Sequence, residues 1–376
     1  MELYFDNAAA MKPDPALTAY LAQIVPASFC NQEALASPGA KLMAQAEQEI
    51  LDSLCGDAAG EYRVWFVNTG TDAVRASFDA MGMILAEKGK NTGKIALSGG
   101  EHASVKKAAD DSGLTEQIFA CDREGFITEN DYAAAVAPDC RIAAVHFVQP
   151  ESGIVQDLLP LRRVLDERAP DAMLFADAIQ GAGKIPFDFS AVQPDFFTLS
   201  GQKLGALSGA ALICRKTFLP ALKKLRLEQH STGRVPPVLA KHLAAVLCSW
   251  VSLQEQRAFS AQELKDLLFA ELERMLPGVF RRTIAENVPV SPYITHLLFP
   301  GYQGAILTRA LSGRGIITSP GSACDAETDR PSEALTWMGL PSSLAFCALR
   351  ISFSPANDRD GVCTLVRSLA EILRQY

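Results

Sequence analysis

The 376-residue chain is 48% hydrophobic and 21% charged, a composition typical of a soluble globular protein that is long enough for two domains. Its 43 acidic and 35 basic side chains give a net charge of −8, which argues against a protein that binds nucleic acid or an anionic membrane. No apolar run could span a bilayer, the first residues lack a signal-peptide pattern, and the nine cysteines form no CxxC pair, so we expect a protein of the reducing cytoplasm.

The first part of the chain predicts an extended arm, then a strand and a helix. Residues 1–15 contain Asp-Asn-Ala-Ala-Ala and two prolines, and we expect them to lie over the body of the protein. A strand at 63–67 leads into the turn 68–72, which is rich in small and hydroxyl-bearing residues and opens a helix. The first N–H groups of a helix have no internal acceptor, so this turn is a candidate phosphate site. Many α/β loops share this pattern, so the pattern by itself does not identify a ligand.

Strand and helix patterns then alternate along the middle of the chain, for example around the helix at 158–167. The predicted strands are 94–97, 117–121, 141–148, 172–176, 195–199 and 210–214. Alternation of this kind predicts an α/β fold with a large, doubly wound and mostly parallel sheet that is covered on both faces.

The last part of the chain predicts a small α+β domain. Two helices, 236–259 and 260–276, come first, and Ser260 with Glu263 forms a capping-box pattern at the start of the second. The strands predicted after them are 294–299, 316–319 and 349–353, and the helices are 304–311, 332–338 and 357–374. We therefore predict a large domain over 16–255 and a small domain formed by 1–15 with 256–376.

Asp177 and Lys203 each follow a short apolar strand. The carboxyl ends of parallel strands form the ligand-binding edge of an open α/β sheet, so both side chains are expected in one crevice. An amine and a carboxylate suit an aldehyde cofactor with a ring nitrogen: the amine forms a Schiff base, and the carboxylate keeps the ring nitrogen protonated. The alternative is a surface lysine and an aspartate that caps a helix.

Three further side chains are candidates for chemistry, each with an ordinary alternative. His102 follows a strand and could stack on a planar cofactor, or simply cap the next helix. Cys324 lies in a polar loop of small residues, where a thiol is either a mobile nucleophile or an exposed spectator. Arg350 is a cation within an apolar strand, and its partner is either a substrate carboxylate or an acidic side chain of the protein. The other histidines show no metal-ligand spacing, so no metal is predicted.

With these residues in place, the chain resembles the cysteine desulfurases of the class V aminotransferase group, which are fold-type I pyridoxal-phosphate enzymes. The resemblance runs nearly from end to end. It is carried by Tyr-Phe-Asp-Asn-Ala-Ala at 4–9, the phosphate turn at 68–72, Glu-His at 101–102, Asp-Ala-Ile-Gln at 177–180, Ser-Gly-Gln-Lys at 200–203 and Gly-Ser-Ala-Cys at 321–324. The distance from Cys324 to Pro331 matches the long-loop branch of the family, which supplies iron–sulfur cluster assembly.

The resemblance implies a pyridoxal 5'-phosphate site. The cofactor-binding residues that it implies are Gly70, Thr71, His102, Asp177, Gln180, Ser200, Gln202, Lys203 and Thr232. Lys203 would carry the cofactor, Asp177 would hold the pyridine nitrogen, and His102 would stack on the ring. Gln180 would hold the phenolic oxygen, and Thr232 would reach the phosphate of a neighbouring subunit, which implies a homodimer.

The resemblance also implies the reaction and the residues that bind its substrate. L-Cysteine would be converted to L-alanine, and its sulfur would pass to Cys324 as a persulfide. Arg350 and Asn31 would bind the substrate, and a sulfur-acceptor protein is an expected partner. Two alternatives remain: a class V aminotransferase or lyase such as a selenocysteine lyase, with Cys324 incidental, and a non-catalytic sulfur-relay or scaffold subunit. A scaffold would not need Lys203, Asp177 and His102 together.

The sequence departs from the family pattern at three places. Pro150 replaces an asparagine that contacts cofactor and substrate, and a proline can donate no hydrogen bond. Gln202 replaces the histidine before the lysine; its amide can still donate to phosphate, but it carries no charge. The glycine-rich segment upstream of Thr232 is replaced by Leu-Arg-Leu-Glu-Gln at 225–229. The resemblance therefore constrains the identity of the substrate and the docking of a partner less than it constrains the cofactor site.

Overall fold

The computed structural model describes residues 2–28, 37–122, 124–229, 235–321 and 331–375. Three of the predicted site residues, Asn31, Thr232 and Cys324, lie outside these ranges.

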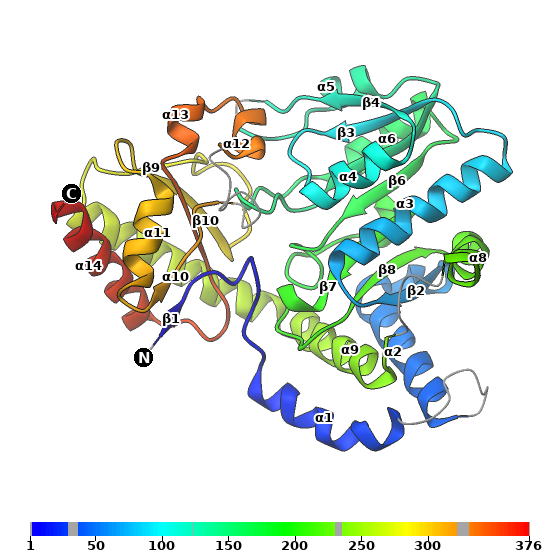
Figure 1. Ribbon diagram of the computed structural model, residues 1–376, viewed down its shortest axis with the longest axis horizontal. Coiled ribbons are helices and arrows are strands. Elements are labelled where there is room, and N and C mark those ends of the chain that lie inside the picture. The colour runs from blue at the N-terminus through cyan, green and yellow to red at the C-terminus, as the bar shows by residue number, and fades with distance from the viewer. Residues whose placement is uncertain (1, 29–36, 123, 230–234, 322–330, 376) are drawn as a thin grey trace.

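A seven-stranded sheet forms the centre of the larger part of the molecule, with the strand order β2-β8-β7-β6-β5-β3-β4 (Figure 1). Its strands are β2 (Tyr62–Val67), β3 (Lys94–Ser98), β4 (Thr115–Phe119), β5 (Cys140–His146), β6 (Met173–Asp177), β7 (Phe196–Ser200) and β8 (Ala210–Arg215). From β7 to β4 the neighbouring strands pair in parallel, whereas β8 runs antiparallel to both β2 and β7. The predicted doubly wound, mostly parallel sheet is confirmed.

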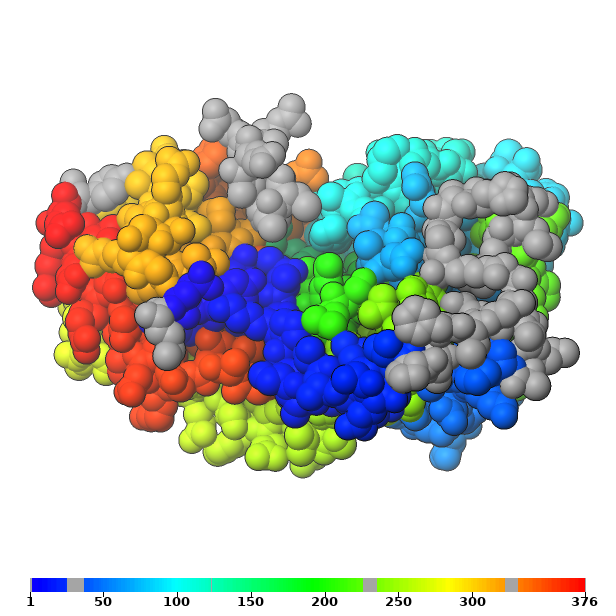
Figure 2. Space-filling model, turned by 60° about the horizontal axis from the view of Figure 1, so that its bottom comes forward, coloured from blue at the N-terminus to red at the C-terminus, as the bar shows by residue number. Residues whose placement is uncertain are grey.

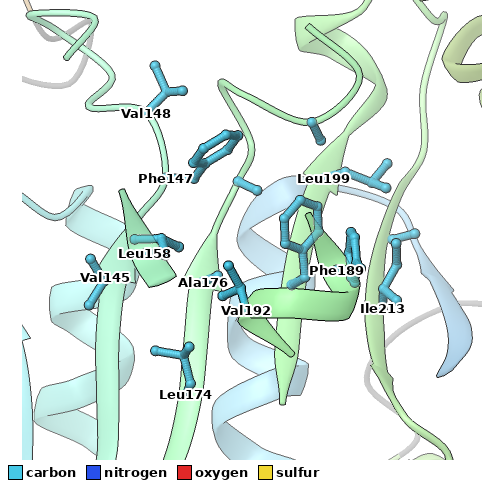
Figure 3. Close-up of a cluster of buried hydrophobic side chains, with 14 of the residues drawn as sticks. Val145, Phe147, Val148, Leu158, Leu174, Ala176, Phe189, Val192, Leu199 and Ile213 are labelled. Atoms are coloured by element: carbon cyan, nitrogen blue, oxygen red, sulfur yellow. The ribbon is translucent and has the colours of Figure 1, made fainter. Parts of the chain in front are cut away.

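Both faces of the central part of this sheet are covered, because successive residues of β5, β6, β7 and β8 point to opposite sides and nearly all of them are apolar and buried. Leu174, Ala176 and Leu199 face one side, where they pack with residues of α6 and α9, as Figure 3 shows for part of this core. Phe175 and Phe196 face the other side, against α3 and α8. The flanking helices are α1 (Pro15–Ser28), α2 (Pro38–Cys55), α3 (Gly70–Glu87), α4 (Ala103–Asp111), α5 (Glu129–Ala135), α6 (Leu158–Arg168), α7 (Phe189–Val192), α8 (Leu219–Gln229) and α9 (Pro237–Ser252).

A second core forms at the other end of the molecule, around a small antiparallel sheet with the order β12-β10-β9. Its strands are β9 (Arg281–Arg282), β10 (Ile294–Leu298) and β12 (Ala348–Ser352). The helices here are α10 (Gln254–Met275), α11 (Gly304–Ser312), α12 (Glu333–Trp337), α13 (Ser342–Ala345) and α14 (Arg359–Gln375). Ala261, in the first half of α10, still belongs to the core of the large sheet, whereas Leu264, Leu268 and Leu272 of the same helix belong to this second core. The change of core thus lies within α10, a few residues after the predicted domain boundary at 255, and that boundary stays a prediction.

The N-terminal arm connects the two cores. Its strand β1 (Leu3–Tyr4) pairs in parallel with β11 (Ile316–Ile317), and Asn7 Nδ2 donates to the Ser352 carbonyl at 2.7 Å. A few residues later the Met11 N–H donates to the Gln202 carbonyl, next to Lys203. In Figure 2 this dark-blue segment crosses the surface between the red C-terminal region and the green middle of the chain. The arm is therefore part of both halves of the structure.

The predicted capping box at Ser260 is wrong. The break between the two helices falls at Leu253, and Ser260 lies inside α10 as an exposed residue. Trp250, near the end of α9, packs into the large core, whereas Leu264 and Leu268 of α10 pack into the second core, and the break at Leu253 lies between them. Tertiary packing thus decides where the helix begins, and Ser260 and Glu263 are simply neighbours on a helix surface.

Gly304 lies where α11 meets β12, and we expect its replacement by alanine to destabilise the protein. A Cβ atom there would lie 1.7 Å from the Ala348 carbonyl oxygen, and backbone atoms cannot step aside as a side chain can. We expect Gly304→Ala to lower the free energy of unfolding by about 1–3 kcal/mol in urea denaturation followed by circular dichroism. Gly313→Ala, at the other end of α11, is the control, because its Cβ would make only ordinary contacts. Equal stability of the two variants would contradict the close approach.

Candidate active site

A cavity of about 340 Å³ opens at the carboxyl edge of the large sheet. Its walls come from the segments that follow β2, β3, β5, β6 and β7, together with the N-terminal arm and Arg350 of β12. The predicted residues that it brings together are Gly70, Thr71, His102, Asp177, Gln180, Ser200, Gln202, Lys203 and Arg350. These are all the site residues predicted from the sequence that lie within the described ranges.

Asp177 ends β6 and is 7% exposed. Its Oδ1 atom accepts hydrogen bonds from the Ile179 N–H and the Thr198 hydroxyl, both at 3.1 Å. Burial raises the pKa of the Asp177 carboxyl, and the nearby Glu101 carboxylate raises it further. A buried carboxylate of this kind favours a cationic partner in the cavity, and a protonated ring nitrogen fits that need.

Lys203 and Gln180 are both hydrogen-bonded to the N-terminal arm at the cavity. Lys203 closes the short helical turn η2 (Gly201–Lys203) after β7, and its Nζ atom donates to the Ala9 carbonyl. Gln180 Nε2 donates to the Ala8 carbonyl at 2.9 Å. The arm thus supplies acceptors to the two side chains that the resemblance assigns to the cofactor's aldehyde carbon and phenolic oxygen.

The N-terminus of α3 borders the same cavity. Thr69 caps the helix, and its hydroxyl accepts from the Asp72 N–H while the Asp72 carboxylate accepts from the Thr69 N–H. A Cβ atom at Gly70 would lie 2.9 Å from Cδ1 of Ile179 and 3.3 Å from Cβ of Ser200, so a larger residue would require the Ile179 side chain to move. The first-turn N–H groups of Gly70 and Thr71, with the Ser200 hydroxyl, fit an anionic group such as a phosphate.

His102 has the helix-capping role that the sequence left open, while its stacking on a planar cofactor stays a prediction. It is the N-cap of α4, where its Nδ1 atom accepts from the Ser104 N–H at 3.1 Å, and it also lines the cavity. Capping fixes the ring at the mouth of the site, where it can meet a planar ligand.

Arg350 has an acidic partner within the protein. It is 3% exposed, and its Nη2 atom forms an ion pair with Asp6 Oδ1 of the arm at 2.9 Å. Its Nη1 atom donates to the Pro150 carbonyl at 3.1 Å. The alternative of a structural acidic partner is therefore confirmed, while Arg350 still lines the cavity. Pro150 can donate no hydrogen bond, but its carbonyl orients the guanidinium.

The sequence reasoning missed a buried pair at the cavity wall, formed by Glu101, which lines the cavity, and His146. Glu101 Oε1 accepts from both the backbone N–H and Nδ1 of His146, each at 2.7 Å, and both side chains are buried. His146 was predicted only as a strand residue. The signal that could have led to the pair is Glu101 itself, a charged residue next to His102 in the motif already singled out.

The described residues contain neither a metal-binding cluster nor a helix that could cross a membrane. No three histidine, cysteine, aspartate or glutamate side chains in these ranges are grouped so that they could hold a metal ion. Among the helices of the same ranges, none combines the length and the apolar character that crossing a membrane requires.

The doubly wound sheet defines an α/β protein that places an amine, a buried carboxylate and a helix N-terminus at its carboxyl edge, a set of groups that fits an anionic ligand with a basic ring. The model of the family described as aminotransferase class-V matches residues 3–365, and the chain belongs to this family. It is 26% identical to a cysteine desulfurase of Gluconacetobacter diazotrophicus, over 99% of this chain and 94% of that protein. It is 27% identical to the putative cysteine desulfurase IscS 1 of Bacillus subtilis, over 99% of both chains.

Solved structures show the same fold. A NifS-like protein superposes with a TM-score of 0.85 at 18% identity over the whole of both chains. A NifS-like protein from Rickettsia africae gives a TM-score of 0.83 at 19% identity, also over the whole of both chains. The predicted fold class and family are confirmed.

Proposed function

We propose that this protein is a pyridoxal-phosphate-dependent cysteine desulfurase. L-Cysteine and the Cys324 thiol would give L-alanine and a Cys324 persulfide, so that the sulfur atom moves and all atoms balance. The observation that carries the proposal is the cavity in which the Asp177 carboxylate, the Lys203 amine and the Arg350 guanidinium lie together. The relatives named cysteine desulfurase, which match nearly the full chain, support the same reaction.

The residues of the cavity fit the cofactor. When bound, pyridoxal phosphate supplies an electron sink that stabilises the negative charge left on the substrate when the C–S bond breaks. Lys203 would attach it, Asp177 would keep its ring nitrogen protonated, and His102 would lie on its ring. Its phosphate would be held by Gly70, Thr71, Ser200 and Gln202, and by Thr232 across a homodimer. Gln180 would donate to its phenolic oxygen.

The substrate would bind at the end of the cavity formed by the arm and β12. Arg350 would take the carboxylate, with Asn31 as a second contact. Asp6 already holds one edge of the guanidinium, so the substrate carboxylate would share Arg350 with it rather than meet a free cation. Asp6 and the Pro150 carbonyl thereby fix the direction in which Arg350 presents its remaining N–H groups.

The sulfur would leave the site on Cys324 and pass to an acceptor protein, for iron–sulfur cluster assembly or another sulfur-transfer pathway. The cytoplasm is the proposed location, because an odd number of scattered cysteines without CxxC pairs fits a reducing compartment.

The test is the release of alanine and sulfide from L-cysteine in the presence of a thiol reductant. We expect the wild-type protein to release both in equal amounts and Cys324→Ser to release neither, while the variant keeps its cofactor absorbance. Cys121→Ser is the matched control, because burial raises the pKa of the Cys121 thiol to about 12 and leaves it unreactive. If wild type and Cys324→Ser both bind the cofactor but are equally inert, the desulfurase proposal is wrong. Pro150 would then indicate a class V lyase or aminotransferase for another amino acid.

A further inference from the structure

Asp6 pairs with Arg350 without lining the cavity itself. Arg350 lines the cavity, and among the described residues of its wall the arm contributes Ala8 and Ala9 but not Asp6. The Asp6 Oδ1 atom lies 2.9 Å from Arg350 Nη2, and the two side chains are 17% and 4% exposed. A ligand in the cavity would therefore meet the guanidinium and not the Asp6 carboxylate.

The contacts of Arg350 leave it free donors but balance its charge. A guanidinium has five N–H groups, and the hydrogen bonds to Asp6 and to the Pro150 carbonyl use one each. The Nε atom of Arg350 is buried and has no hydrogen-bond partner within the described ranges. The Asp6 carboxylate offsets the positive charge, and this weakens the attraction of Arg350 for a further anion. The donors of this site and its charge are thus set separately.

The residue opposite Arg350 on the neighbouring strand carries no charge. His296 of β10 faces Arg350 in the β10–β12 pair. Burial lowers the pKa of the His296 imidazole to about 3, and the charge of Arg350 lowers it as well, so the ring is neutral near pH 7. Of these two neighbours, Asp6 alone changes the charge that Arg350 presents.

The residues around Asp6 fasten the arm to β12 without the Asp6 side chain. The Phe5 carbonyl accepts from the Ser352 N–H at 2.7 Å, and the Ala8 N–H donates to the Ser352 hydroxyl at 2.8 Å. Asn7 Nδ2 donates to the Ser352 carbonyl at 2.7 Å. Removal of the Asp6 charge is therefore expected to leave the arm beside β12.

We propose that Asp6 sets the affinity of the site for α-carboxylates: by balancing the charge of Arg350, it keeps both substrate and product weakly bound. The proposal rests on the proposed role of Arg350 as the group that takes the substrate carboxylate, and Asp6 is a positioning residue that acts through it. L-Cysteine and L-alanine carry the same carboxylate, so a stronger cation would bind both more tightly. Because that gain is uniform through the reaction, it would lower KM without raising kcat.

The test measures binding without turnover. L-Alanine is titrated into the cofactor-loaded protein by isothermal titration calorimetry, and wild type is compared with Asp6→Asn. Asparagine keeps an oxygen that can accept from Arg350 Nη2 but lacks the charge, so we expect the Kd of L-alanine to fall by about fivefold or more. The KM for L-cysteine should fall by a similar factor, with kcat within about twofold of wild type. Asp6→Ser is the second neutral variant and serves if Asp6→Asn does not fold.

Glu2→Gln is the matched control, because Glu2 belongs to the same arm but pairs with Lys12 at 3.0 Å on the surface. We expect this variant to keep the wild-type Kd. Asp6→Glu retains the charge and is expected to give a Kd within about twofold of wild type. L-Alaninamide, which lacks the carboxylate, should bind to Asp6→Asn no more tightly than to wild type.

If Asp6 only holds the arm and Arg350 in place, its neutral variants would bind L-alanine equally or more weakly, and either result would overturn the proposal. The same gain in Glu2→Gln or with L-alaninamide would also overturn it, as would the absence of L-alanine binding by every protein tested. Failure of the desulfurase assay alone would leave the calorimetric comparison intact, because binding of alanine requires no transfer of sulfur.

Discussion

Lys203→Ala is expected to abolish attachment of pyridoxal phosphate and to lower the turnover of L-cysteine by a factor on the order of 10³ or more. The reason is that the Lys203 amine is held at the carboxyl edge of β7, in the cavity that also contains Asp177 and the α3 N-terminus. Alanine can neither attach the cofactor nor move a proton at the substrate. Borohydride reduction followed by mass spectrometry reports attachment, and alanine release reports turnover.

Lys106→Ala is the control for this result. Lys106 also lines the cavity, but its amine forms an ion pair with Glu333 of α12 at 2.7 Å at the rim. We expect that variant to retain attached cofactor. Retention of borohydride-stable cofactor by Lys203→Ala would mean that another amine attaches it, and the assignment of Lys203 would be wrong.

Asp177→Asn is expected to lower kcat by a factor on the order of 100 while the cofactor stays bound. Asparagine keeps the size of the side chain and an oxygen for the Ile179 N–H and the Thr198 hydroxyl, so the local fold is preserved. What it loses is the negative charge. In a buried site, water cannot replace that charge. Without it the ring nitrogen of the cofactor is no longer kept protonated, and an unprotonated ring withdraws electrons poorly. Steady-state alanine release and cofactor content, measured on the same samples, distinguish a lower kcat from a loss of bound cofactor.

Asp195→Asn provides the comparison. Asp195 is equally buried, but it lies at the opposite end of β7 and pairs with Arg162 and Arg215, each at 3.1 Å. Its replacement is expected to lower thermal stability and leave kcat within about twofold of wild type, since no ligand meets it. If Asp177→Asn also stayed within twofold, its carboxylate would have no part in the reaction.

The fold could be predicted well where burial alone decides the structure. The apolar runs at β5, β6 and β7 are buried on both faces of a sheet, and the sequence showed them as continuous runs. The direction of β8 could not be predicted, because a buried strand has the same apolar pattern whether its neighbours run parallel or antiparallel to it. The break at Leu253 was also missed, since it depends on where Trp250 packs and not on local capping residues.

The candidate site was predictable to the extent that its residues follow strands. Asp177 and Lys203 were expected in one crevice from their places at strand ends, and both line the cavity. The partners that come from distant segments were not predictable. Asp6 pairs with Arg350 across 344 positions of sequence, and Lys184 lies over the rings of Trp250 in α9 and Tyr293 before β10. Contacts of this kind depend on the assembled fold, and no local sequence pattern predicts them.

The N-terminal arm has a consequence for the order of events during synthesis. The arm is synthesised before the large sheet, but its partners Ile316–Ile317, Arg350 and Ser352 are synthesised after it. A nascent chain that stopped before β12 would already contain every strand of the large sheet, yet Asp6 would have no guanidinium to pair with and one wall of the cavity would be missing. Capture of a ligand by the new protein is therefore a late event, which follows synthesis of the residues around 350.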